Sequence, residues 1–287
     1  MPAVARVGDK TACPMTTPSA HVEGVLANNT PVCAQANGKF VIRLADFADC
    51  KVPPRDVVMT GAATVVLCGL PLARLGDKMD HGGTIVIGSP NVDIGGPTFA
   101  LPANFTLDGD PEFKNKTVRD LYKLSTTPSG KALIDRLETA NKPLTIQQHT
   151  GTNGYCTPNS GTDAGNGTGT GSLIQYNPDY RSNAFDKDGN LLAQPPTIIL
   201  GHEMTHALAN AEGHQQQGGV DPAAPVSEPT IDQEESQAIG TGSHDGEAVN
   251  ENALRDDLGL GRRDNHYGTG GPDPNEPTPI NLRPGDC

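Results

Sequence analysis

The chain has 287 residues, of which 35% are hydrophobic and 4% aromatic, and it contains 34 glycines and 25 prolines. This length suffices for one large domain or two of ordinary size, and so much glycine and proline favours short strands and turns. No apolar run approaches the ~20 residues of a membrane-spanning helix, and the N-terminus lacks the apolar segment of a Sec-type signal peptide. We therefore expect neither stable membrane insertion nor Sec-dependent export.

The net charge belongs to one part of the chain. Residues 1–97 are neutral overall, whereas residues 98–287 carry the whole net charge of −13. Such an acidic part repels phosphates, so nucleic-acid binding is not expected. We divide the chain into a first domain at 1–97, a linker at 98–112 and a second domain at 113–267. The Pro/Gly-rich tail that follows, 268–287, is expected to be disordered.

Residues 1–97 are predicted to form short strands between glycine turns, with a helical period only at 43–50. An internal repeat is present, because ARVGDK at 5–10 recurs as ARLGDK at 73–78. Recurrence of a six-residue unit with one conservative change predicts two structurally equivalent turns.

This region resembles the PAAR-repeat family, the tip proteins of type VI secretion spikes. The resemblance rests on PAVARVGD at 2–9, PLARLGD at 71–77 and HGGTIVIGS at 81–89, with an atypical stretch at about 26–56. It implies an all-β cone of short strands whose base docks on a VgrG trimer. Export would then use the type VI system without a signal peptide, from the cytoplasm of the producing cell into a target cell.

The PAAR family holds a zinc ion near the apex of the cone with His and Cys ligands. By motif, the resemblance places Cys13, His21 and His81 at this site, although the region has two histidines where the family usually has three. Thiolate and imidazole ligands suit zinc, and a metal stabilises a domain with a small core. Ordinary turn residues and buried thiols are the alternative. The candidates for a fourth ligand are Cys33, Cys50 and Cys68.

The second domain is predicted to combine helices and strands. The expected elements are helices at 111–126 and 130–141 (the latter capped by Ser129), strands at 143–150 and 172–178, and a tight turn at 185–190. The glycine-rich segment at 151–172 is expected to be a mobile loop. An α+β fold follows from this order of elements.

The motif HEMTH lies in a helix predicted to begin at two prolines and to end at Gly213. His202 and His206 are four residues apart, so both project from one helix face and can bind one Zn²⁺. Glu203 follows the first histidine and can act as general base toward a zinc-bound water. The alternative is a helix with two solvent-facing histidines and a surface glutamate.

A catalytic zinc needs a third protein ligand and one open position. Two later segments, 230–242 and 246–259, are predicted to be helical and acidic. Glu235 is the preferred ligand because the following Ala-Ile pair would face the core, and Glu234, about 100° away on the helix, is the runner-up. The weaker candidates are Glu247, Glu251, Asp163 and His244.

Residues 113–267 resemble the gluzincin-like effector metallopeptidases of the NleD type, which are injected into host cells. The matching stretches are GSLIQYNP at 171–178, HEMTH at 202–206, EESQAI at 234–239 and ENALR at 251–255, followed by Gly259, Arg263 and Tyr267. The resemblance implies a zincin-like fold in which an edge strand at 172–176 runs beside the active-site helix and pairs with an extended peptide. It also supports Glu235 as the third ligand.

A further donor should stabilise the oxyanion that forms during hydrolysis. We select Tyr267 as the catalytic donor, with Arg255 and His266 as alternatives.

These predictions together describe a specialised spike-tip effector that delivers a zinc peptidase toxin, with one catalytic and one structural Zn²⁺. Its expected partners are a VgrG trimer, a protein or peptide substrate, and an immunity protein or chaperone. Two alternatives remain: a structural tip with an inert or binding C-terminal extension, and a zinc amidase that acts on cell wall.

Overall fold

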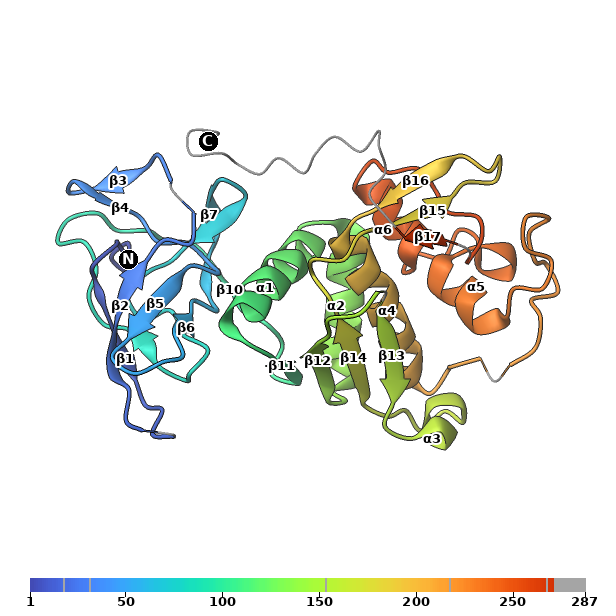
Figure 1. The fold of residues 1–287 in the computed structure, drawn as a ribbon, viewed down its shortest axis with the longest axis horizontal. Helices are drawn as coiled ribbons and strands as arrows, with labels where there is room; N and C mark the ends of the chain where they lie inside the picture. The colour runs from blue at the N-terminus through green and yellow to red at the C-terminus, as the bar shows by residue number, and fades with distance from the viewer. Residues whose placement is uncertain (18, 31, 153, 217, 267, 271–287) are drawn as a thin grey trace. The chain divides into compact units, whose positions relative to one another are not determined.

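The computed structural model describes residues 1–270 apart from 18, 31, 153, 217 and 267, and Figure 1 shows its elements. The chain divides into two compact units. Unit 1 comprises Met1–Leu101 with Asp110–Tyr122, and unit 2 comprises Pro102–Gly109 with the described residues from Lys123 onward. Within the described ranges, no helix is long and apolar enough to cross a bilayer.

Unit 1 is rich in short strands. An antiparallel sheet in the order β6-β5-β2-β1-β9 contains β1 (Lys10–Cys13), β2 (Val22–Ala27), β5 (Phe47–Cys50), β6 (Asp56–Val57) and β9 (Thr84–Ile85). A second sheet, β10-β7-β8, contains β7 (Gly61–Leu67), β8 (Leu70–Leu72) and β10 (Thr98–Phe99). A hairpin joins β3 (Gln35–Ala36) and β4 (Lys39–Phe40).

The repeated turn of unit 1 occurs three times, not twice. Arg6–Asp9, Arg43–Asp46 and Arg74–Asp77 are buried ion pairs with N–O distances of 3.0, 3.4 and 3.3 Å. In each pair, the backbone N–H of the arginine donates to the carboxylate of the aspartate. The prediction of a helical period at 43–50 is therefore wrong. Its apolar residues are buried because a turn and then β5 cross the core, not because they form one face of a helix.

The backbone around the three turns repeats as well. Ile42 N–H donates to the carbonyl of Ala5, Ala73 to that of Ile42, and Ala5 to that of Ala73, which closes a ring of three hydrogen bonds. The third residue of each turn has a left-handed backbone, with φ of 85° at Gly8, 66° at Ala45 and 89° at Gly76. Unit 1 therefore has internal three-fold pseudosymmetry, and the alanine in one copy hides the repeat.

The segment expected to be a linker, 98–112, contributes to regular structure. β10 pairs with β7, while β11 (Phe105–Asp108) pairs in parallel with β12 (Leu144–Gln148). Asp110 Oδ1 accepts the N–H of Phe113 at 2.8 Å at the start of α1 (Pro111–Ser125), where side-chain capping satisfies an unpaired helix donor. The linker prediction is corrected accordingly.

The larger sheet of unit 2 has the order β11-β12-β14-β13, in which β11, β12 and β14 are parallel and β13 (Tyr155–Pro158) runs antiparallel to β14. The strand expected at the edge, β14 (Ser172–Tyr176), instead lies between β12 and β13. β13 and the short helix α3 (Gly161–Gly165) come from the segment expected to be a mobile loop. The edge position expected for 172–176 is therefore wrong, and the loop prediction is wrong for 155–158 and 161–165. Backbone pairing forms β13 without an apolar alternation in its sequence.

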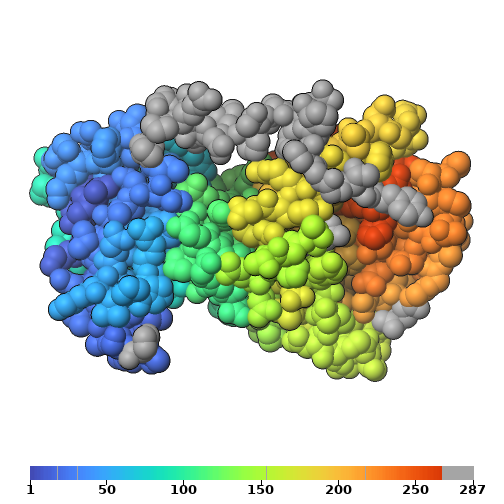
Figure 2. All heavy atoms as spheres, in the orientation of Figure 1, coloured from blue at the N-terminus to red at the C-terminus, as the bar shows by residue number. Residues whose placement is uncertain are grey.

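The second sheet of unit 2 is antiparallel, with β15 (Ser182–Phe185) between β16 (Leu191–Gln194) and β17 (Gly268–Gly270). The expected tight turn joins β15 to β16, and this hairpin, coloured yellow, lies on the surface beside the orange segments (Figure 2). The expected tail begins with β17, so that prediction is wrong for 268–270. Residues 271–287 lie outside the described residues.

The helices of unit 2 follow the prediction, although the last two are shorter. They are α2 (Pro128–Ala140), α4 (Pro196–Glu212), α5 (Gln233–Ile239) and α6 (Glu251–Asp257), with a 3₁₀ turn at Gly242–His244. Thr127, not Ser129, caps α2, because its side chain accepts the N–H of Gly130.

Helix α4 is the centre of unit 2. It contacts β13 and β14 of the sheet as well as α2, α5 and α6, and it is buried on every face from Pro196 to Ala211. A helix enclosed in this way holds its side chains in fixed directions. Gly213, with φ of 75°, ends it in the left-handed conformation that the sequence predicted.

Candidate metal centres and the cleft of unit 2

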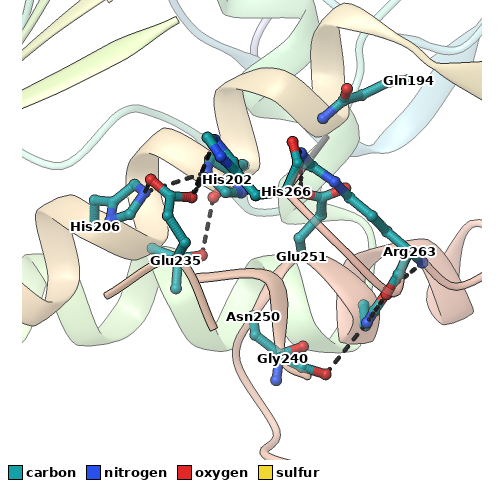
Figure 3. Close-up of polar contacts among 12 residues, drawn as sticks. Gln194, His202, His206, Glu235, Gly240, Asn250, Glu251, Arg263 and His266 are labelled. Carbon is teal, nitrogen blue, oxygen red and sulfur yellow. Dashed lines mark hydrogen bonds and ion pairs between the residues drawn. The ribbon is translucent and has the colours of Figure 1, made fainter. Parts of the chain in front are cut away.

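Two histidines of α4 meet a glutamate of α5. The Nε2 atoms of His202 and His206 are 3.1 Å apart, a contact that their spacing of one helical turn allows. Glu235 Oε2 lies 3.4 Å from His202 Nε2, and its Oε1 lies 3.6 Å from His206 Nε2. Figure 3 shows the three side chains pointing toward one another. We call His202, His206 and Glu235 the three-residue group.

The position of Glu235 depends on how α5 begins. Asp232 is the N-cap, and its Oδ1 accepts the N–H of Glu235 at 2.9 Å. Ala238 and Ile239 are buried, as the sequence predicted, and they fix the helix against the core. Glu235 is therefore held in the first turn of a short helix with its carboxylate directed at α4.

His202 is supported from behind by a buried network of charges. Its Nδ1 lies 2.9 Å from Glu251 Oε2, and Glu251 is fully buried. Arg255 Nε donates to Glu251 at 2.7 Å and Arg263 Nη1 donates to it at 2.8 Å. The charges of two guanidinium groups outweigh the burial of Glu251 and hold the pKa of its carboxyl well below its usual range. Glu251, a weaker ligand candidate in the sequence, thus lies behind His202.

His206 is also contacted from behind, but by a different carboxylate. Its Nδ1 lies 3.3 Å from Glu234 Oε1. The same oxygen accepts a hydrogen bond from Gln215 Nε2 at 2.9 Å. The two ligand candidates on α5 therefore lie on opposite nitrogens of the histidine. The other weak candidates, Glu247, Asp163 and His244, are not in any group of described residues that could hold a metal ion together with His202 or His206.

Glu203 lies next to the three-residue group but not in it. It is buried and lines the cleft. Burial raises the pKa of its carboxyl, while His202 and His206 act in the opposite direction. A Cβ atom added to Gly154 would lie 2.7 Å from Glu203 Cγ, so only glycine leaves room for this side chain. The arrangement gives a confined carboxylate of increased basicity.

The three-residue group opens into a cleft of about 840 Å³. The edge strand β13 contributes one wall through Tyr155, Cys156 and Thr157. The rest of the lining comes from β16, α4, α5 and the segment before β17. It includes Gln194, Ile199, Arg263 and His266. Because β13 pairs on one side only among the described residues, an extended chain could lie along its other edge in the cleft.

The three candidates for the oxyanion donor have different positions. His266 lines the cleft, with its Nε2 3.6 Å from Glu235 Oε2 (Figure 3). Arg255 is fully buried and bound to Glu251, so it does not reach the cleft. Tyr267 lies outside the described residues.

The carboxylates around the three-residue group favour a positive charge on His202. Burial favours neutral His202, but Glu235 and Glu251 outweigh it and raise the pKa of His202 to about 10. Glu235 Oε2 is buried and makes no hydrogen bond with any described residue. Two imidazoles and one carboxylate are a ligand set that zinc accepts, with a further position left open. The residues present therefore fit a zinc ion.

A second group of metal-ligating side chains lies in unit 1. Cys13 of β1, His21, Cys50 of β5 and His81 bring four ligand atoms within 4.8 Å of one another, and we call them the four-residue group. His81 Nδ1 lies 3.6 Å from Cys13 Sγ and 3.9 Å from Cys50 Sγ. Of the three cysteines left open by the sequence, Cys50 is thus the one that completes the set.

The four-residue group also fits a metal. His21 is fully buried, yet neither of its ring nitrogens has a hydrogen-bond partner among the described residues. Burial, with smaller contributions from Asp56 and Cys13, raises the pKa of Cys50 to about 12. Two thiols and two imidazoles that lie close together are typical of a closed zinc site.

The fold and the two groups define a two-part protein in which a strand-rich unit is joined to a mixed α/β unit with a polar cleft. The family model of the M91 peptidases, described as effector proteins, matches residues 102–267, and that of the PAAR motif matches residues 2–87. The first match spans more than half of the chain. The chain therefore belongs to peptidase family M91, with a PAAR motif at its N-terminus.

Comparison with solved structures gives distant similarities to light chains of Clostridium botulinum neurotoxins. The serotype F light chain is 16% identical with a TM-score of 0.34, over 47% of this chain and 45% of that one. The serotype HA light chain is 17% identical with a TM-score of 0.34, over 52% and 48%. This chain thus covers less than half of each, and no feature is inferred from them. No curated protein matches.

Proposed function

We propose that this chain is a type VI spike-tip effector whose PAAR unit carries a zinc-dependent peptidase with a zincin-like fold. The observation that supports the peptidase most directly is the convergence of His202, His206 and Glu235 beside the carboxylate of Glu203. The chain belongs to peptidase family M91, and the residues of this arrangement lie within the part that matches the family, which supports a peptidase activity. The four-residue group is proposed to hold a second, structural zinc.

A zinc ion held by the three-residue group would supply Lewis-acid chemistry, polarising the scissile carbonyl and lowering the pKa of a water molecule. Glu203 accepts a proton from the attacking water and later returns it to the leaving amine. Burial, which raises the pKa of its carboxyl, makes it a better base for this task. His266 at the cleft and Tyr267 are proposed to donate hydrogen bonds to the developing oxyanion.

The substrate is proposed to be an extended segment of a protein. An added strand pairs its backbone with an exposed sheet edge, and in unit 2 the edge that borders the cleft is β13. Tyr155–Pro158 thus takes the role that is expected of 172–176 from the sequence. The peptide bond to be cut would then lie across the cleft near Glu203.

The two parts of the chain have separate roles in this proposal. Residues 1–97 dock on a VgrG trimer, and residues 113–267, extended at their N-terminal side by β11, perform the chemistry. The protein is made in the cytoplasm, leaves through the type VI system and acts in the target cell. An immunity protein or a chaperone would protect the producing cell.

The experiment that tests the enzyme claim compares the full chain with its Glu203→Ala variant. We expect the variant to keep its zinc but to lose roughly 10²–10⁴-fold or more in peptidase rate, because the proton acceptor is gone. Zinc content is measured by metal analysis and rate with unfolded protein substrates. Expression of both forms in the cytosol and in the periplasm then locates the target by toxicity.

Glu212→Gln is the matched control, since this glutamate lies at the end of the same helix and pairs with Arg136 outside the cleft. If the Glu203→Ala variant cuts as fast as the parent, the general-base role is refuted. Cleavage of peptidoglycan crosslinks in place of protein would favour the amidase. Absence of zinc from the cleft of the parent would favour an inert extension.

A further inference from the structure

The two histidines of the three-residue group are supported unequally. Glu251, behind His202, is fully buried and bound by two arginines. Glu234, behind His206, has a side chain that is 33% exposed, and no described arginine or lysine forms an ion pair with it. One support is thus locked into the core, whereas the other lies at the cleft surface.

The geometry determines what Glu234 can do. Its Oε1 is 3.3 Å from Nδ1 of His206, while the opposite nitrogen, Nε2, is the one that faces Glu235 and His202. A carboxylate at Nδ1 holds the ring proton on that atom, which leaves the lone pair of Nε2 free for a metal. It also fixes the orientation of the ring and increases its basicity as a ligand.

Neighbouring residues on one helix turn thus reach opposite sides of the same imidazole. Glu235 extends to the metal side of His206, and Glu234 extends to its back. The consecutive glutamates are therefore not competing candidates for a single role. We infer that Glu234 is a positioning residue that acts through His206 and sets the zinc affinity of the cleft, an inference that rests on the proposed zinc site.

The test is a metal titration of the full chain, with Co²⁺ followed by absorption and Zn²⁺ followed by competition with a chelator. The thiolates of the four-residue group give a charge-transfer band that the cleft group lacks, so the two sites are read separately. We expect Glu234→Ala to weaken metal binding in the cleft by about 10–100-fold. Glu234→Gln keeps an oxygen acceptor for Nδ1–H and is expected within about threefold of the parent.

Two control variants separate positioning from mere support of the fold. Gln215→Ala removes the contact of Gln215 with Glu234 but keeps the pairing with His206, so it should bind metal like the parent. Glu247→Ala removes a comparable carboxylate–imidazole pair, 2.8 Å from His244 Nδ1 and outside the cleft, and should also have no effect. Thermal unfolding should be equal for all forms once metal has been removed from the cleft.

Several outcomes would overturn the inference. Parental metal affinity in Glu234→Ala would exclude a positioning role. Complete loss, as expected for Glu235→Ala, would make Glu234 a ligand. A loss of the same size in Gln215→Ala would show a structural role only. If the cleft of the parent binds no metal, the proposed zinc site fails as well, and this result differs from the other three.

Discussion

The two metal-ligating groups differ in the number of side chains that they bring together. The four-residue group of unit 1 supplies two cysteines and two histidines, whereas the three-residue group of unit 2 supplies two histidines and one glutamate beside a cleft. Four protein ligands close a zinc site, and three leave a position for substrate or water. Ligand number thus distinguishes a group suited to stabilise a fold from one suited to chemistry.

The groups also differ in how their ligands are supported. In unit 2, a separate carboxylate lies behind each histidine. In unit 1, Asp56 lies 3.6 Å from His81 Nδ1, while both ring nitrogens of His21 lack a hydrogen-bond partner among the described residues. The histidines of the three-residue group are thus oriented by neighbouring carboxylates, whereas the ligands of the four-residue group are held mainly by burial.

The largest expected effect comes from removing metal selectively. A chelator should abolish peptidase activity by emptying the open three-residue group first, while zinc at the enclosed four-residue group stays until the unit unfolds. Metal analysis after brief chelation should find about one zinc per chain, and added zinc should restore activity. Simultaneous loss of both metals, or activity that withstands the chelator, would break the comparison.

A second prediction concerns Gly154, which leaves space for Glu203. Because an added Cβ would lie 2.7 Å from Glu203 Cγ, Gly154→Ala should displace the carboxylate and lower kcat by about 10²-fold without loss of zinc. Gly161→Ala is the control, since a Cβ there meets nothing within 4 Å. Steady-state kinetics with metal analysis checks this, and equal kcat for both variants would contradict it.

The smallest expected effect separates the cysteines of unit 1. Cys50→Ser replaces one ligand of the four-residue group and should weaken its zinc binding by more than about tenfold, with a lower melting temperature. Cys33 is exposed and lies outside the group, so Cys33→Ser should change neither quantity. Peptidase activity should stay at the parental level in both. A zinc affinity that depends on Cys33 instead would show that the fourth ligand has been misassigned.

Local spacing carried most of the information that the sequence held about the cleft. The interval of four residues between His202 and His206 predicts a shared helix face, and both rings do lie together. The choice of Glu235 also depends on local information, because apolar residues follow it on a helix. Glu251 and Arg263 could not be assigned to the back of His202, because their meeting depends on how α6 and the segment before β17 pack against α4.

The missed features of the fold share a physical cause. β13 is held by backbone pairing in a stretch rich in Gly and Thr, where side-chain periodicity carries no signal. The third turn of unit 1 keeps only Arg43 and Asp46 of the repeated motif, and Ala45 replaces the glycine. The apolar residues of this turn and of β5 resemble a helical period in the sequence because consecutive residues are buried. Long-range contacts decided the structure in both places.

The ring of hydrogen bonds that joins Ala5, Ile42 and Ala73 has a consequence for biosynthesis. Ala5 and Ile42 both need Ala73, which is made later, so a nascent chain that ends before Ala73 has no closed ring to fold around. Contacts between distant parts of a sequence are slow to form, because the loops must close first. The N-terminal unit is thus committed to folding only after the chain through Ala73 has left the ribosome, which precedes synthesis of the helix that carries the histidines.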